Sequence, residues 1–251
     1  MVAAESDWPR RTDNGAAPAR RAALANWDEP VKQAGTSRRG ARRVLGAVSG
    51  AAVLALVSCG ANKFSYIDNS AENTYIRVPN EWKVFTVEGG GVRPEAFPDS
   101  VESVWHIAFD ASQKPSLQNT SAIDALPPAS VDEPVGQLQI FDVTGSFNQE
   151  LSLTTARSTA LGIDPLGVPD EIKDLVEIVS YTPLSQDGMQ GSRVVYNLHN
   201  EGEPWQTVDA TTLFDQSRNR FYVLRIGCTS ECFRDNQDAI SEIATSWKVV
   251  R

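Results

Sequence analysis

The sequence is poor in the residues from which most catalytic and metal sites are built. Only three cysteines and two histidines occur among its 251 residues, and neither His106 nor His199 has companions at the spacing of metal ligands. Both histidines fall opposite the apolar positions of predicted strands, so we expect them to face solvent. A GxSxG nucleophile motif and the phosphate-binding motifs GxxxxGK and GxGxxG are also missing. These absences argue against a metal, a cofactor and a catalytic function.

Basic residues are scarce after residue 58. Residues 1–58 contain nine Lys/Arg and five Asp/Glu, whereas the chain from Cys59 onward contains 14 basic and 27 acidic residues, a net charge of −13. Nucleic-acid binding needs clustered Lys and Arg that displace counterions from phosphates, and anionic membrane surfaces attract polybasic segments. An acidic domain favours neither partner. The change in charge predicts a removable leader followed by a separate mature domain.

Only one long apolar run occurs, the uncharged segment 44–57, which follows four closely spaced arginines. It suits the core of a signal peptide and is too short to span a bilayer, which takes about 20 residues. It ends in Leu56-Val57-Ser58-Cys59, which resembles the lipobox of bacterial lipoproteins. That resemblance implies a diacylglycerol on the Cys59 thiol and cleavage just before it. We therefore predict a signal peptide with a long basic n-region at 1–58, and a lipid anchor on the extracytoplasmic face of the cell membrane.

Two features of the leader leave alternatives open. The arginine pairs at 38–39 and 42–43 each match only part of a twin-arginine signal, so general and twin-arginine export both fit. Residues 1–36 are rich in Ala, Arg, Pro and Gly without periodicity. They are either an extension too polar to bury a core, or sequence upstream of a true start nearer Val31.

After a lipidated tether at 59–72, residues 73–251 have the length of one domain. Segments with alternating apolar and polar residues predict strands at 74–78, 82–87, 104–109, 138–143, 194–198, 208–214 and 221–226. Residues 215–219 are typical of a hairpin loop between the last two. Residues 111–134 contain four prolines and predict a long surface loop.

Helical patterns interrupt these strands. Ser146 and Gln149 form a capping-box pattern for a helix that ends at Gly162, and a short helix within 170–178 leads into a strand near 179–181. Ser230 can cap a last helix whose apolar stripe is Phe233, Ile240, Ile243 and Trp247. Strands and helices out of strict alternation predict an α+β domain, an antiparallel sheet with helices packed on it.

Two cysteines remain once Cys59 carries the lipid. Cys228 ends a predicted strand and Cys232 lies in the first turn of the last helix, where chain reversal brings the two within bonding range. In an exported domain we predict a disulfide between them. A redox pair is the alternative, but oxidoreductase motifs have two intervening residues and this pair has three.

The segment Pro79-Asn80-Glu81-Trp82 and the final helix running into Ser246-Trp247-Lys248-Val249 resemble the PsbP-like fold, found among actinobacterial envelope lipoproteins. The resemblance implies an α-β-α sandwich and a role in binding or assembly rather than catalysis, with no functional residue carried over. It predicts a non-enzymatic interaction domain with a protein partner in the cell envelope. The alternative is an envelope enzyme or small-ligand carrier whose site is dispersed in sequence.

Overall fold

The computed structural model describes residues 63–87, 97–124 and 130–250. The predicted leader, Cys59 and the first residues of the tether lie outside the described residues. The strands are β1 (Phe64–Asn69), β2 (Thr74–Pro79), β3 (Lys83–Thr86), β4 (Val101–Asp110), β5 (Val135–Val143), β6 (Val176–Gln186), β7 (Met189–Leu198), β8 (Gln206–Asp215), β9 (Arg220–Thr229) and β10 (Lys248–Val249). The helices are α1 (Leu117–Thr120), α2 (Phe147–Glu150), α3 (Leu153–Leu161), α4 (Ser230–Asp235) and α5 (Gln237–Ser246), with 3₁₀ turns η2 (Ser121–Asp124) and η3 (Lys173–Leu175).

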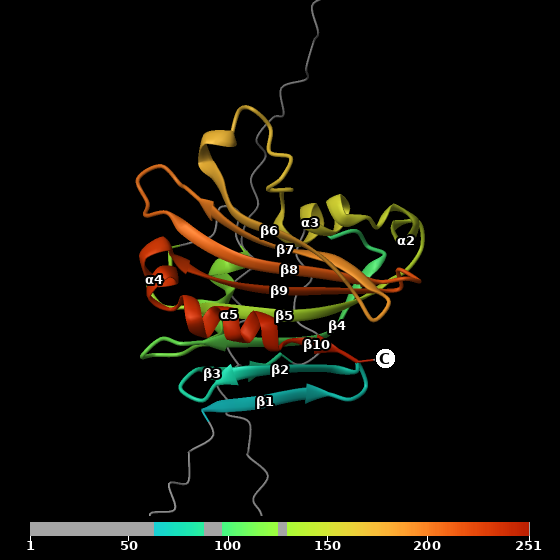
Figure 1. Ribbon diagram of the computed structural model, residues 1–251, viewed down its shortest axis with the longest axis horizontal. Helices are drawn as coiled ribbons and strands as arrows, with labels where there is room; N and C mark the ends of the chain where they lie inside the picture. The colour runs from blue at the N-terminus through green and yellow to red at the C-terminus, as the bar shows by residue number, and fades with distance from the viewer. Residues whose placement is uncertain (1–62, 88–96, 125–129, 251) are drawn as a thin grey trace, which may run out of the picture. The chain divides into compact units, whose positions relative to one another are not determined.

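Two antiparallel sheets form the domain (Figure 1). The larger has the strand order β3-β4-β5-β9-β8-β7-β6, and the smaller has the order β1-β2-β10. Each predicted strand is present, and β8 and β9 form the predicted hairpin, with Phe214 paired to Phe221. The predicted α+β class, an antiparallel sheet with helices packed on it, is confirmed.

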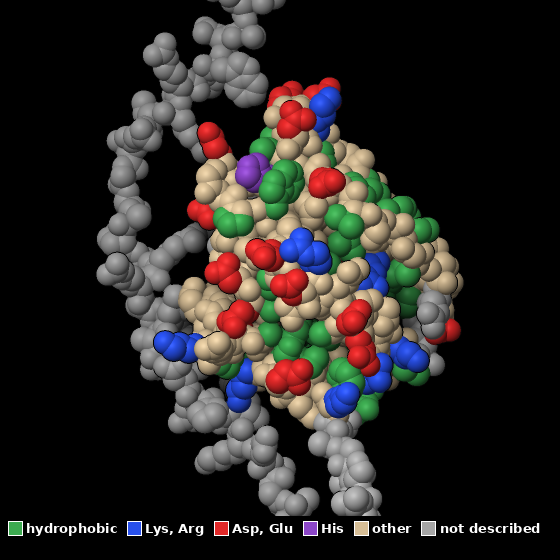
Figure 2. Space-filling view, turned by 60° about the vertical axis from the view of Figure 1, so that its left-hand side comes forward, with side chains coloured by type: hydrophobic (Ala, Val, Ile, Leu, Met, Phe, Trp, Pro, Cys, Tyr) green, Lys and Arg blue, Asp and Glu red, His purple; other side chains and the backbone are tan. Residues whose placement is uncertain are grey.

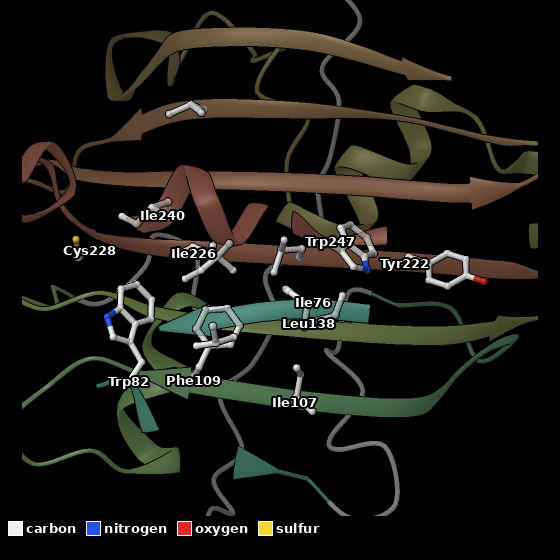
Figure 3. Close-up of a cluster of buried hydrophobic side chains, with 14 of the residues drawn as sticks. Ile76, Trp82, Ile107, Phe109, Leu138, Tyr222, Ile226, Cys228, Ile240 and Trp247 are labelled. Carbon is white, nitrogen blue, oxygen red and sulfur yellow. The ribbon is translucent and has the colours of Figure 1, made fainter. Parts of the chain in front are cut away.

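Helices cover both faces of the larger sheet. Successive side chains of a strand point to opposite faces, so each central strand contributes to two apolar clusters. On one face Leu138 and Ile226 meet β2, α4 and α5, and the same cluster contains Trp82 and Trp247 (Figure 3). On the other face the apolar residues of β5, β8 and β9 pack under α2 and α3. Burying each such large side chain contributes about 1.5–3 kcal/mol, so both layers hold the sheet.

The two predicted helix starts are each displaced. Ser146 has helical backbone angles and makes no side-chain cap, so only the single turn α2 follows it. The capping box is formed instead by Ser152 and Thr155, which starts α3, and α3 ends at Gly162 as predicted, with φ 76°. The last helix is capped by Thr229 rather than Ser230, and it breaks at Asn236 into α4 and α5.

Two segments predicted to lack regular structure contain some. β1 lies within the predicted tether and pairs with β2 along its whole length. The predicted surface loop at 111–134 contains α1 and η2, and the fully buried Asp110 organises its start. The Asp110 carboxylate accepts hydrogen bonds from the Ser112 and Ser116 N–H groups, at 2.7 and 2.9 Å, and from the Asn119 amide, at 2.8 Å.

The prediction that His106 faces solvent is wrong. His106 is buried on β4. Alternation predicts an exposed face only when one side of a sheet is open, and here α1 packs against β4 and β5 on the side opposite α5. His199, at the end of β7, is half-buried, and its ring stacks on Trp205 with 4.7 Å between ring centroids.

Candidate binding surface at the sheet edge

The strand β6 is unlike the other long strands because both of its faces are largely exposed. From Glu177 to Thr182 every side chain is exposed, whereas the neighbouring β7 is buried at most positions. β6 is the last strand of the larger sheet, and in the described part of the chain no strand pairs along its outer side. Its outward backbone groups are therefore available for pairing.

Large apolar side chains gather at this strand and beside it. Eight large hydrophobic residues of the described chain are exposed, and six of them belong to β6, to the segment 166–175 before it or to the β7–β8 loop. Val179 is the most open of the six, at 56 % exposure. We call these six residues the edge surface: Leu166, Leu175, Ile178, Val179, Tyr181 and Trp205.

A buried ion pair supports the middle of the edge surface. The Arg157 guanidinium, on α3, lies 5.7 Å from the centre of the Tyr181 ring and donates two hydrogen bonds to the Asp164 carboxylate, at 2.7 and 2.8 Å. The backbone N–H of Leu166 donates to the same carboxylate at 3.0 Å. Arg157 and Asp164 are both nearly inaccessible to solvent. One ion pair thus positions Tyr181 and Leu166 together.

The ion pair also shifts the ionisation of both partners. Burial opposes the charge of Asp164, but the hydrogen bonds from Arg157 and from the Leu166 N–H outweigh it and lower the pKa of the Asp164 carboxyl below its ordinary value. The hydrogen bond to Asp164 likewise raises the pKa of Arg157, against the effect of its burial. Both groups are therefore charged throughout the physiological range.

His199, which follows β7, contacts two further residues of the edge surface, Leu175 and Trp205. The His199 N–H donates to the Leu175 carbonyl at 2.9 Å, and the His199 ring stacks on Trp205. The Trp205 carbonyl in turn accepts a hydrogen bond from the Ser230 N–H at the start of α4, at 2.8 Å. Backbone hydrogen bonds thus join His199 to Leu175 and Trp205 to the start of α4, and the rings of His199 and Trp205 stack on each other.

Acidic residues gather at the end of the edge surface where β6 begins. Six carboxylates lie on β6, in the segment before it and in the β7–β8 loop: Asp170, Glu171, Asp174, Glu177, Glu201 and Glu203. The nearby Lys173 pairs with Asp170 at 3.2 Å. Acidic side chains gather at the upper end of the molecule in Figure 2, with exposed hydrophobic side chains just below them. The edge is therefore apolar along the strand and negative where the strand begins.

The predicted cysteine pair lies away from this edge. Cys228 and Cys232 form a disulfide that joins the end of β9 to the first turn of α4, and both are buried against the cluster that contains Trp247. The disulfide therefore has a structural environment. Trp82 is a core residue, and so is Trp247, as the apolar stripe of the last helix predicted, whereas Trp205 is exposed.

A shallow hollow lies elsewhere on the domain. It has a volume of about 270 Å³ and lies between the β1–β2 turn and the end of β10. The Arg220 guanidinium there pairs with Glu72 at 3.1 Å and with Asp142. Arg220 and Glu72, which both line the hollow, are therefore paired with each other. Over residues 63–87, 97–124 and 130–250, no three His, Cys, Asp or Glu side chains cluster as metal ligands, and no helix is long and apolar enough to cross a membrane.

Comparison with known proteins gives likenesses in structure alone. No family model and no curated protein matches the sequence. Among solved structures, CyanoP, the PsbP protein of the cyanobacterium Synechocystis, is 14 % identical, with a TM-score of 0.40 over 78 % of this chain and 99 % of that one. The Ran-binding protein Mog1p of Saccharomyces cerevisiae is 8 % identical, with a TM-score of 0.38 over 74 % and 95 %. LpqN of Mycobacterium tuberculosis, involved in cell envelope biogenesis, is 14 % identical, with a TM-score of 0.35 over 68 % and 93 %.

The sequence-based predictions do not include the edge surface. A strand near 179–181 is predicted from the residues, but its place at the end of the sheet is not. The signal that was available is the proline in the middle of the strand, Pro183, since proline within a sheet is confined to edge strands and bulges.

Proposed function

We propose that the chain is a lipoprotein held at Cys59 on the extracytoplasmic face of the cell membrane, where its domain binds a protein partner through the edge surface. The leader, residues 1–58, would be removed, and the acyl chains on Cys59 would provide the anchor. The lipobox at 56–59 and the arginines and uncharged segment before it support the anchor. A disulfide in the domain suits an oxidising compartment outside the cytoplasm.

The observation that carries the binding role is the exposure of β6. Soluble domains seldom leave contiguous apolar groups and an unpaired strand on the same surface, since such edges promote association. Here Ile178, Val179 and Tyr181 follow one another on an outermost strand, and each is at least 37 % exposed. The ion pair of Arg157 with Asp164 holds Tyr181 in place, which suits a preformed binding surface.

A binding role without catalysis also fits the charged groups of the domain. Buried ion pairs satisfy one another rather than pointing into a cleft: Arg157 with Asp164, and Arg193 with Asp209 at 2.9 Å. Burial raises the pKa of the Asp209 carboxyl, and the bidentate contact with Arg193 offsets part of that effect. These pairs join neighbouring elements of the fold, as structural ion pairs do.

The anchor is tested with Cys59→Ala. We expect the wild-type chain to incorporate a radiolabelled fatty acid and to shorten on maturation, and the variant to do neither. Cys228→Ala is the matched control, because it also removes one thiol and should still be acylated. If Cys59→Ala matures to the same size and still partitions into detergent, the anchor proposal is wrong.

The binding role is tested by photo-crosslinking in cells. A photoreactive amino acid at Val179 should give one adduct of reproducible mass, and the same group at the exposed Asp238 on α5 should not give that adduct. A second change, Ile178→Asp, should abolish the Val179 adduct while leaving the level of the protein unchanged. Identical adducts from both positions would show that the edge surface is not the binding site.

A further inference from the structure

The turn between β6 and β7 establishes which backbone groups of β6 point outward. Asp187 and Gly188 have φ of 51° and 74° and form a two-residue hairpin turn between the paired residues Gln186 and Met189. In such hairpins the flanking pair is bonded across the ladder, so Gln186 points toward β7. Every second residue then points away, which places the N–H and C=O of Tyr181 and Ser185 on the outer side.

Pro183 agrees with this assignment and limits the free edge. It shares the outward orientation of Tyr181 and has no N–H, so its ring costs no hydrogen bond to β7. It also removes an outward donor, which leaves the segment Val176–Thr182 as the part of β6 able to pair with another strand. A β-bulge between Ile178 and Ser180 lies within that segment and exposes Val179.

The two faces of this segment differ in chemistry. Ile178 and Tyr181 pair with Tyr196 and Val194, whose side chains lie in the apolar cluster under α3, so they share that face. Glu177 pairs with Asn197 on the opposite face and accepts a hydrogen bond from its amide at 2.9 Å. A strand added beside β6 would therefore have apolar neighbours on one face, and on the other the carboxylate of Glu177 with the hydroxyls of Ser180 and Thr182.

Building on the proposed function, we infer that β6 binds an extended segment of its partner by strand addition, and that the segment alternates apolar residues with Lys or Arg. Main-chain hydrogen bonds to Tyr181 and its outward neighbours supply affinity, and the two faces of the added strand supply specificity. Apolar residues would meet Ile178 and Tyr181. Basic residues would meet Glu177 and the surrounding carboxylates.

The charge of the edge distinguishes this partner from a second copy of the chain. Pairing of β6 with β6 of another copy would bring together two acidic edges, each with Glu177 and the carboxylates at Asp170, Glu171 and Asp174. Like charges across neighbouring strands oppose pairing, whereas opposite charges favour it. A basic extended segment therefore complements the edge better than another β6 does.

The test uses the full-length chain in a non-ionic detergent and two labelled eight-residue peptides. In one peptide valine alternates with lysine, and in the other valine alternates with glutamate. Fluorescence anisotropy at low salt should show that the wild type binds the lysine peptide at least tenfold more tightly than the glutamate peptide. The double variant Glu177→Lys, Asp174→Lys should instead prefer the glutamate peptide. Hydrogen exchange should slow within 176–182 only when the lysine peptide is present.

Proline substitutions separate backbone pairing from side-chain contact. Tyr181→Pro removes an outward N–H together with the ring, while Tyr181→Ala removes the ring alone. Strand addition predicts that the proline variant binds the lysine peptide at least tenfold more weakly than the alanine variant. Ser185→Pro is the matched control, because it also faces outward but lies beyond Pro183, and it should bind as the wild type does.

Three results would overturn the inference: equal affinity for the two peptides, equal affinity of the Tyr181→Pro and Tyr181→Ala variants, or a chain that sediments as a dimer and becomes monomeric in Tyr181→Pro. The last result would assign the edge to a second copy. If strand addition is wrong but the edge surface still binds a partner, the peptides fail to bind while the Val179 adduct in cells persists. Loss of that adduct would instead contradict the proposed function itself.

Discussion

The C-terminal segment and the edge strand β6 both carry a row of large apolar residues, and the fold uses them in opposite ways. Ile240 and Ile243 of α5 are fully buried and Trp247 is 8 % exposed, because α5 packs between β2 and the larger sheet. Ile178, Val179 and Tyr181 of β6 stay open to solvent. An apolar row therefore shows where burial is favourable, but neighbouring elements decide whether it occurs within the domain or against a partner.

The two regions also differ in how their aromatic residues are held. The Trp247 indole donates a hydrogen bond to the Thr74 hydroxyl at 3.0 Å and belongs to the cluster that joins both sheets. Tyr181 lies beside the Arg157 guanidinium and stays 40 % exposed. Structural and binding aromatics should thus respond to mutation with opposite patterns, a large loss of stability for the first and a large loss of binding for the second.

The largest effect should come from Trp247→Ala. Truncating a buried Trp costs about 3–5 kcal/mol, a large part of the roughly 5–15 kcal/mol that stabilises a typical domain. Chemical denaturation should show this loss or a failure to fold. Trp205→Ala, the same change at the edge surface, should lower the free energy of unfolding much less. Equal losses in the two variants would remove the distinction between the regions.

Asp164→Asn should have the next largest effect. It leaves the buried Arg157 without its charged partner, and hydrogen bonds to charged groups contribute about 1.5–3 kcal/mol. Because folding lowers the pKa of Asp164, the carboxylate stabilises the fold fully above its unfolded pKa of about 3.9. Denaturation at several pH values should therefore show a difference between variant and wild type that is constant above that pH.

Below that pH the difference should shrink, as the wild-type carboxyl becomes protonated on passing through its lowered folded pKa. The exposed pair of Asp170 with Lys173 supplies the control, because Asp170→Asn should scarcely change stability at any pH. A pH-independent difference for Asp164→Asn would show that its charge is not what matters.

Loss of the disulfide should have a smaller effect. Bridging residues four positions apart closes a short loop, for which chain entropy gives about 2 kcal/mol. Cys228→Ser with Cys232→Ser should lower the denaturation midpoint accordingly, and reduction of the wild type should lower it by a similar amount. Alkylation without reductant should modify neither cysteine in the wild type. Two reactive thiols under oxidising conditions would contradict the pairing.

The smallest change in stability should come from Val179→Asp, at the most exposed residue of the edge surface. Surface substitutions usually alter stability by no more than about 0.5 kcal/mol. Chemical denaturation of the variant beside the wild type should show a difference within that range. A loss of stability comparable to that of Trp247→Ala would show that β6 is part of the core.

Local patterns in the sequence predicted much of the frame. Alternation placed Ile76 and Val78 on the buried face of β2, and helical spacing placed Ile240, Ile243 and Trp247 in the core. The predicted helix end at Gly162 was right, whereas both predicted N-caps were wrong. Several Ser and Thr residues precede each helix, and only the three-dimensional packing decides which of them is the cap. The lipobox at Cys59 remains a prediction from sequence.

What the residues alone determined is the class of structure and the direction in which each strand or helix buries its apolar side, because those depend on neighbours within a few positions. The order of strands depends on contacts between residues far apart, so only the tertiary structure made β6 an edge and β4 a strand buried on both faces. The same long-range packing buried His106, joined Arg157 to Asp164 under Tyr181, and left Val179 exposed. The candidate binding surface is therefore a property of the assembled sheet. The backbone of β6 is hydrogen-bonded to β7 along one side, and no described strand lies along its other side.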